Sequence, residues 1–202
     1  QAAQLLGARS VLVIAPASTL LNWESEWATW GNGATFTTIS YGSLRNLNRA
    51  KQWDLVIIDE AHFAKNPNAK RTKHSLEIAA EARNTILLSG TPMPNDPTEL
   101  FAPIQALWPE VLEDLGLETA TDWLNRFCQY RMVSFNRGPK TPRVYGTKNM
   151  DQLRPHLKKI MLRRTLDDVA LELPPLRVDI HRLPRDDKFF AGTEVGELLE
   201  EA

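Results

Sequence analysis

The chain has 202 residues, of which 43% are hydrophobic and 24% charged, and its formal net charge is −1. This balance is typical of a soluble globular protein with one sizeable core, and no apolar run approaches the roughly 20 residues that span a bilayer. Cys128 is the only cysteine, which excludes an internal disulfide and a thiolate zinc cage and favours a small buried side chain.

Apolar runs and helical patterns alternate over the first half of the chain. We expect strands over residues 11–15, 35–40, 54–58 and 85–88, and helices over residues 1–6, 19–30, 44–53 and 71–83. Gly7 is predicted to end the first helix. Trp23, Trp27 and Trp30 recur at helical spacing, which favours core packing over base stacking. The alternation predicts an α/β fold with a parallel sheet flanked by helices.

The second half of the chain has a different pattern. A proline-rich turn precedes a helix expected over residues 98–108. The strand pattern then disappears, and residues 112–164 look basic and mainly helical around a loop at residues 138–142. Residues 176–183 suggest an extended segment that enters a second domain. We therefore predict three regions, with bounds at residues 1–111, 112–165 and 166–202.

Positive charge is concentrated in the middle of the chain. Residues 121–165 hold 11 Lys/Arg against 2 Asp/Glu, a local charge of +9, whereas both flanking regions are acidic. Aromatic residues are interleaved with these charges, namely Phe127, Tyr130, Phe135 and Tyr145. Such a block is typical of a polyanion-binding surface, although a solvated basic face has the same composition.

The most informative stretch is residues 54–62, which read D-L-V-I-I-D-E-A-H. Its apolar run is typical of a strand buried on both faces, and in open α/β sheets ligands bind beyond the carboxyl ends of such strands. Asp59 and Glu60 fall at that position. A carboxylate there suits Mg²⁺ and its neighbour can orient an attacking water, so the spacing favours ATP hydrolysis. An Asp-Glu pair is also common at an ordinary helix start.

Five segments follow one another along the chain: V-L-V-I-A-P-A-S-T-L-L-N-W-E-S-E-W (11–27), I-S-Y-G-S-L-R (39–45), V-I-I-D-E-A-H-F-A-K-N-P-N-A-K-R-T-K (56–73), I-L-L-S-G-T-P-M-P-N-D-P-T-E-L-F (86–101) and I-M-L-R-R-T-L-D-D-V-A-L-E-L-P-P (160–175). They resemble motifs Ia, Ib, II and III and the lobe bridge of the Swi/Snf-type ATPases of helicase superfamily two, most closely the annealing-helicase branch. The resemblance implies a first RecA-like lobe that uses ATP and Mg²⁺ and acts on DNA.

One expected element is missing from the chain. The G-x-x-x-x-G-K-[ST] loop, which cradles nucleotide phosphates, occurs nowhere in the sequence. The resemblance implies that it lies just before the first helix, and Gln1 begins neither a signal peptide nor a natural start. We expect an excised piece of an intracellular protein, and a lobe that never had the loop is the alternative. Because the second lobe is also absent, the piece alone is expected not to turn over ATP.

The resemblance implies roles at the nucleotide site. Asp59 is expected to hold Mg²⁺ through water, Glu60 to position or deprotonate the hydrolytic water, and His62 to link the phosphate site to motif III. In motif III the coupling residues are Ser89, Gly90 and Thr91. A lone histidine is often only structural, and short hydroxyl side chains also suit an ordinary turn. No contact is transferred to Pro94, where the wider family often has glutamine.

DNA is expected to be held through its phosphates. The candidate contacts are Ser18, Asn22, Lys65, Lys70, Arg71, Lys73, Lys158 and Lys159. Arg163 and Arg164 lie at the bridge and are expected to help orient the two lobes, although basic residues also suit an ordinary helix end. The expected partners are double-stranded or branched DNA and a second RecA-like lobe of the same protein, with no membrane.

These features together predict a DNA-dependent ATPase that moves along duplex DNA and remodels DNA or DNA-bound proteins. It is expected inside the cell, in the nucleus if the protein is eukaryotic and in the cytoplasm if it is bacterial or phage-encoded. An RNA-directed DEAH-type helicase is an alternative, but P-A-S-T-L-L-N-W and the L-R-R bridge fit DNA translocases better. A nucleic-acid-binding module without catalysis is the other alternative.

Overall fold

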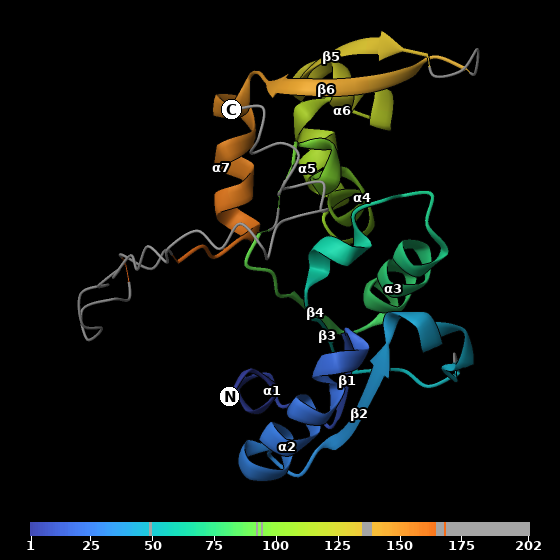
Figure 1. Cartoon of the computed structure of the whole chain (residues 1–202). Helices are drawn as coiled ribbons and strands as arrows, with labels where there is room; N and C mark the ends of the chain where they lie inside the picture. Colours follow the sequence, from blue (N-terminus) through green and yellow to red (C-terminus); the bar gives the residue numbers. More distant parts are fainter. Residues whose placement is uncertain (49, 92, 94, 135–138, 165–167, 169–202) are drawn as a thin grey trace, which may run out of the picture. The chain divides into compact units, whose positions relative to one another are not determined.

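The computed structural model describes residues 1–48, 50–91, 93, 95–134, 139–164 and 168. Residues 1–161 form one compact unit and residues 162–202 a second. The first unit contains a four-stranded parallel sheet of order β2-β1-β3-β4 (Figure 1). Its strands are β1 (Ser10–Ala15), β2 (Thr35–Ser40), β3 (Leu55–Ile58) and β4 (Asn84–Leu87). The predicted parallel sheet is therefore confirmed, and each strand lies within one residue of its expected bounds.

The two central strands, β1 and β3, bury side chains on both faces because successive residues point to opposite sides. One face packs against α2 (Leu20–Trp30) through Val11, Val13, Leu55 and Ile57. The other face packs against α3 (Lys70–Glu81) and the 3-10 helix η2 (Tyr41–Asn46) through Leu12, Ile14, Val56 and Ile58. Each buried aliphatic side chain contributes roughly 1.5–3 kcal/mol, which fixes the carboxyl ends of both strands firmly.

The connections before and after β1 follow the sequence signals. The first helix, α1 (Ala2–Leu5), ends where Gly7 adopts φ +60°, with Gly7 N–H donating to Gln4 O at 3.1 Å and Ala8 N–H to Ala3 O at 2.9 Å. A 3-10 turn, η1 (Ala17–Thr19), leads into α2. Core packing is confirmed for Trp23 and for Trp27, which stacks on Phe36, but Trp30 is 76% exposed.

The predicted helix over residues 44–53 is wrong. Only η2 forms there, and it ends at Asn46. Leu44, Leu47 and Trp53 contribute to the core from a turn and an extended connection. Spacing of three residues is shared by helices and 3-10 turns, and the Asn48 side chain accepts from Ala50 N–H at 3.0 Å, which favours a turn over a continuing helix.

A second core lies within the same unit, formed by α4 (Thr98–Leu107), α5 (Pro109–Leu115), α6 (Ala120–Phe127) and α7 (Met150–Ile160). Trp123 and Phe127 are fully buried in it, and the Trp123 indole donates to Pro97 O at 2.8 Å. Cys128 is buried as predicted, and burial raises the pKa of its thiol to about 11. The cluster includes side chains of α4 as well as of the later helices.

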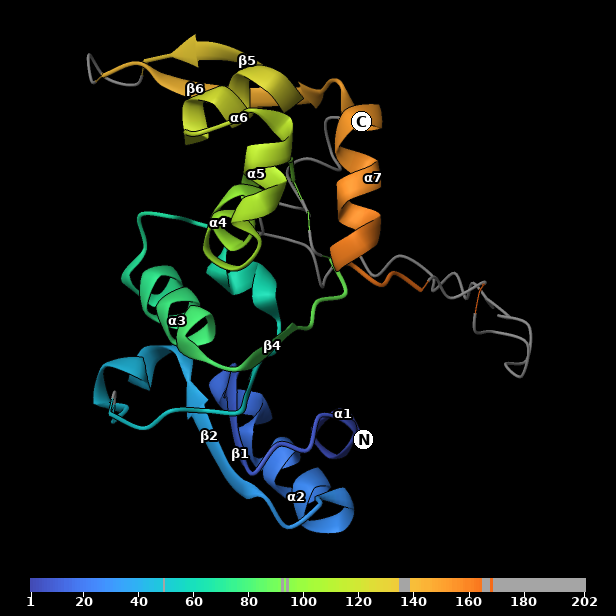
Figure 2. The same ribbon diagram turned by 180° about the vertical axis from the view of Figure 1, so that it is seen from behind.

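The expectation that strands are absent from residues 112–164 is wrong. Strands β5 (Cys128–Val133) and β6 (Thr141–Thr147) pair antiparallel, beside α6 in both views (Figures 1 and 2). Thr141 and Pro142, expected in a loop, belong to β6, while residues 135–138 lie outside the described part. The alternation of inward and outward residues is short, and most of the exposed positions are polar, so the basic composition concealed it.

Several predictions fall on residues that the structure does not describe. These are the extended segment 176–183, the bridge 166–202 apart from Asp168, and the positions Pro92, Pro94 and Phe135. The predicted division into three regions stays a prediction. No helix in the described part of the chain is long and apolar enough to cross a membrane.

Candidate functional site

Asp59 and Glu60 lie at the carboxyl edge of the sheet, directly after β3. Asp59 N–H donates to Ile14 O at 2.8 Å, which continues the pairing of β3 with β1. The Asp59 carboxylate accepts from Trp23 Nε1 through Oδ2 at 2.9 Å and from Glu60 N–H through Oδ1 at 2.9 Å. These two donors fix the direction of the carboxylate, while each oxygen keeps acceptor capacity for a further ligand.

Glu60 has an unusual backbone conformation, with φ 48° and ψ 51°. The left-handed region costs a residue with a Cβ roughly 1–2 kcal/mol, and such strain clusters at functional sites. The Tyr41 hydroxyl donates to Asp59 O at 2.8 Å and to Glu60 O at 3.3 Å, and Ala61 N–H donates to Leu88 O at 2.8 Å. These contacts hold the strained turn in place.

Tyr41 serves this turn as a protonated donor. Burial raises the pKa of its phenol well above the ordinary value of 10.0, and the negative charges of Asp59 and Glu60 raise it further. The residue follows β2 immediately, at the same edge of the sheet as the two acids. It therefore connects the end of β2 to the turn that carries Glu60.

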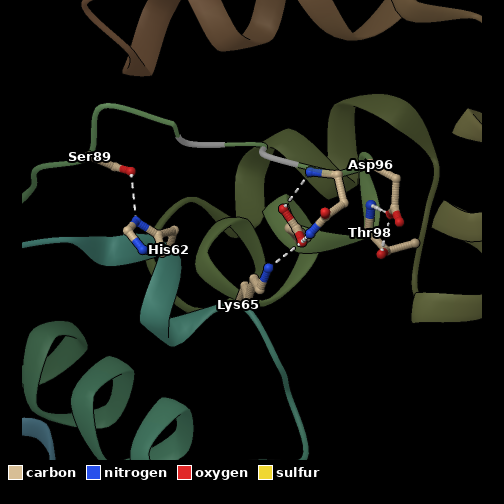
Figure 3. A network of polar contacts seen from close by, with 7 residues as sticks. His62, Lys65, Ser89, Asp96 and Thr98 are labelled. Carbon is tan, nitrogen blue, oxygen red and sulfur yellow. Dashed lines mark hydrogen bonds and ion pairs between the residues drawn. The ribbon is translucent and has the colours of Figure 1, made fainter. Parts of the chain in front are cut away.

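His62 faces Ser89, in the segment after β4 (Figure 3), and its ring also lies beside the Glu60 carboxylate. Its Nδ1 is 3.1 Å from Glu60 Oε2 and 3.5 Å from Ser89 Oγ. Ser89 Oγ also accepts from Thr91 N–H at 3.2 Å, whereas the Thr91 hydroxyl forms no hydrogen bond with another described residue. Gly90 is exposed, with open space around its Cα. The expected meeting of His62 with Ser89 is thus present, while their roles stay predictions.

Lys65 lies in a polar network that sequence reasoning did not foresee. Its Nζ is 2.7 Å from Glu99 Oε1, and Glu99, at the start of α4, is only 9% exposed. Asn95 donates to the same carboxylate through its backbone N–H and its side-chain amide (Figure 3). Burial alone raises the pKa of Glu99, but the hydrogen bonds from Lys65 and Asn95 outweigh it and hold the pKa below its ordinary value. Lys65 is therefore paired with an acid, whereas a contact to DNA stays a prediction.

The other predicted DNA contacts lie on exposed surface in four places. Ser18 is on η1 and Asn22 on α2. Lys70, Arg71 and Lys73 are in the first turn of α3, where the Arg71 guanidinium is 5.7 Å from the Phe63 ring centre. Lys158 and Lys159 are in the last turn of α7. Arg163 and Arg164 are exposed and belong to the second unit.

The donor set at the sheet edge fits Mg²⁺ in the way that nucleotide sites use it. The described residues contain no group of three or more His, Cys, Asp or Glu side chains that could hold a metal. Mg²⁺ keeps several waters and takes its other ligands from one or two carboxylates and from phosphates. Asp59, oriented by Trp23, supplies one such carboxylate.

Sequence reasoning missed three residues of this site. Tyr41 could have been found, because it follows a predicted strand whose end lies at the same edge as Asp59. Trp23 was interpreted as core, and its half-burial from α2 against the residues of β1 and β3 hid the use of its indole N–H. For Glu99 the sequence offered only a weak indication, namely an acidic residue at a helix start, four positions after Asn95.

Comparison with known proteins decides the family. The sequence model of the SNF2-related domain matches residues 34–188. The chain belongs to the SNF2-related family. Its fold and motifs therefore form a first RecA-like lobe of this family, as the sequence predicted.

Relatives of this SNF2-related chain include longer proteins. Human DNA annealing helicase and endonuclease ZRANB3 is 35% identical over 151 residues, which cover 75% of this chain and 13% of that protein. SWI/SNF-related matrix-associated actin-dependent regulator of chromatin subfamily A-like protein 1 of Xenopus tropicalis is 26% identical over 188 residues, covering 81% and 19%. The chain thus spans less than a fifth of either relative's length.

A solved structure has a similar fold. The Sulfolobus solfataricus SWI2/SNF2 ATPase core in complex with dsDNA superimposes with a TM-score of 0.60 at 25% identity. The match covers 82% of this chain and 36% of that one. The parallel sheet with helices on both faces is therefore the fold of an SNF2 ATPase core.

Proposed function

We propose that this chain is part of an ATP-dependent motor that moves along double-stranded DNA and remodels DNA or DNA-bound proteins. The observation that carries the proposal is the position of Asp59 and Glu60 at the carboxyl edge of the parallel sheet, beside His62 and Ser89. In open α/β sheets this edge is where ligands bind. Membership of the SNF2-related family makes ATP the expected ligand.

In this proposal the two acids have different roles because their surroundings differ. Glu60 is the general base or water-orienting residue, since its side chain is 44% exposed and lies 3.1 Å from His62. Asp59 is held by two N–H donors and holds Mg²⁺ through water. The bound ion neutralises charge on the phosphates when ATP is present. Ser89, Gly90 and Thr91 follow β4, and they couple ATP hydrolysis at this site to the segment after that strand.

Contact with DNA is proposed through phosphates, at the residues named from the sequence. The solved SNF2 core in complex with dsDNA supports duplex DNA as the partner. Asn22 and Trp23 are neighbours on α2, and the Trp23 indole donates to Asp59. A shift of this helix on DNA would therefore reach the Asp59 carboxylate directly. We propose this helix as one physical connection between DNA contact and ATP hydrolysis.

The activity is proposed for the intact protein and not for residues 1–202 alone. These residues contain no G-x-x-x-x-G-K-[ST] sequence to cradle the phosphates. We propose that Arg163 and Arg164 help to orient a second RecA-like lobe, and that branched as well as linear duplexes are used. Because its substrate is DNA, the protein acts inside the cell.

An ATPase assay of the intact protein tests this function. Duplex DNA, branched duplex, single-stranded DNA and RNA are compared side by side at equal nucleotide concentration. We expect duplex or branched DNA to stimulate hydrolysis most. Stimulation by RNA but not by duplex DNA would favour the RNA-directed helicase. DNA binding without ATP hydrolysis would favour a module that lacks catalysis.

A further inference from the structure

The hairpin of β5 and β6 belongs to the basic block of residues 121–165, and none of its own residues has yet been assigned a ligand. Residues 128–148 contain five Lys/Arg and no Asp or Glu. The exposed residues of its strands include Gln129, Arg131, Thr141, Arg143 and Tyr145. We call this set the outer face of the hairpin. Its composition favours a ligand that is itself negatively charged.

Two arginines lie directly opposite each other on this outer face. The register pairs Arg131 with Arg143, and neither guanidinium forms a salt bridge within the described part of the chain. Like charges at directly opposite positions destabilise a sheet, so the pair works against the hairpin's own stability. The guanidinium groups of two paired arginines supply several N–H donors suited to phosphate oxygens. An anionic strand would relieve the repulsion.

An exposed aromatic ring accompanies the arginines. Tyr145 is 70% exposed and is the extra residue of a β-bulge, because Tyr130 pairs with Val144 and Gln129 with Gly146. Bulges redirect a side chain, and here the phenol ring is left in solvent two residues after Arg143. Exposed aromatic rings beside basic groups form stacking platforms for unpaired bases. A duplex offers no free base face to such a ring.

The hairpin has a firm base, so its outer face is a fixed surface. Cys128 is fully buried and Val144 packs against the same core as Trp123 and Phe127. Lys148 N–H donates to Phe127 O at 2.9 Å, and the Tyr130 hydroxyl donates to Asn125 Oδ1 at 2.7 Å. These contacts join both strands to α6. Arg131, Arg143 and Tyr145 are thus presented together without needing a ligand to order them.

We propose that the outer face of the hairpin binds a single strand of DNA. Arg131 and Arg143 contact its phosphates, and Tyr145 stacks on one of its bases. The proposal rests on the proposed function only in taking DNA as the polyanion. It adds a contact for unpaired strand to a motor whose other predicted contacts are to duplex phosphates.

Binding by the intact protein tests this proposal, with fluorescence anisotropy of a labelled single strand and of a blunt duplex. The variants are Arg131→Gln with Arg143→Gln, Tyr145→Ala, and Tyr145→Phe. Arg9→Gln with Arg83→Gln is the charge-matched control, because both arginines are exposed and lie away from the hairpin, beside Asp54. Near-ultraviolet circular dichroism verifies that each variant keeps the native fold.

We expect Tyr145→Ala to weaken single-strand binding roughly five- to a hundredfold, the range for loss of one stacked base, and Tyr145→Phe to bind like the wild type. The arginine pair variant should lower the slope of log affinity against log salt by about 1.4, since each phosphate contact on a single strand contributes about 0.7. The control should bind the strand as the wild type does. Unchanged single-strand binding in the arginine pair variant or in Tyr145→Ala, or equal losses for duplex and single strand, would overturn the proposal.

The same variants separate this proposal from the proposed function. ATP hydrolysis at saturating duplex DNA should stay at the wild-type rate in Tyr145→Ala, because the hairpin is not part of the nucleotide site. If the wild type hydrolyses no ATP with duplex DNA, the motor function fails while the hairpin result still stands. If hydrolysis is normal and the single-strand losses are absent, only the hairpin proposal fails.

Discussion

Replacing Lys65 by methionine should measurably destabilise the chain. Lys65 Nζ lies 2.7 Å from Glu99 Oε1, and the two side chains are 36% and 9% exposed. Removing one partner of a fully buried ion pair costs about 3–5 kcal/mol, because the other charge stays buried without compensation. Here Lys65 is partly solvated and Asn95 still donates to Glu99, so we expect a loss of about 2 kcal/mol in the free energy of unfolding.

Urea denaturation followed by tryptophan fluorescence measures this loss, with Lys140→Met as the control. Lys140 is exposed and forms no salt bridge with another described residue, so its change should stay within about 0.5 kcal/mol. Glu99→Gln should cost about 1–2 kcal/mol, and the double variant should cost at least about 1 kcal/mol less than the sum of the single variants. Additive losses would show that the two side chains do not interact.

The pH dependence of the free energy of unfolding gives a second test of the pair of Lys65 and Glu99. Because the pKa of Glu99 is lowered by folding, its stabilisation is present above the ordinary value of 4.5 and is lost as the pH falls through the lower folded value. The difference between wild type and Lys65→Met should therefore be full at neutral pH and shrink on acidification below 4.5. A difference that stays constant through this range would refute the ion pair as its cause.

Three further changes test other parts of the structure. Tyr41→Phe removes the donor to Asp59 O and Glu60 O, so the intact protein should lose about tenfold in kcat with an unchanged KM for ATP; a stability loss without a kcat effect would remove Tyr41 from the site. Cys128 should resist thiol reagents at pH 8 until urea unfolds the chain, because burial raises its pKa to about 11, and rapid labelling of the native protein would contradict this. Thr119→Ala breaks the capping box of α6 and should cost about 1 kcal/mol in urea denaturation, whereas Thr121→Ala, on the same exposed surface, should not.

The parallel sheet was predictable because its central strands are short apolar runs separated by helical segments. Leu55–Ile58 is apolar at every position and buried at every position, so the sequence leaves little choice of structure. The hairpin was not predictable in the same way. Its strands bury Cys128 but expose Arg131, Arg143 and Tyr145, and only pairing within the folded chain reveals the alternation.

The two acidic residues of the site were predictable from their chemistry, but the hydrogen-bond donors that hold them in place were not. Asp59 and Glu60 follow an apolar strand, and that position alone marks them. Tyr41 and Trp23 reach them from other elements, by hydrogen bonds between residues 18 and 36 positions apart. Contacts of this kind depend on side-chain direction across the sheet edge, which periodicity does not specify.

Single-turnover ATP hydrolysis by the intact protein, wild type and Glu60→Gln, measured with saturating duplex DNA, tests whether Glu60 acts at the catalytic site. The substitution keeps the size of the side chain but removes its carboxylate. We expect a loss of about a hundredfold or more in the hydrolysis rate, with nucleotide and DNA affinity nearly unchanged. A hydrolysis rate close to that of the wild type would contradict the assignment of the sheet edge after β3 as the catalytic site.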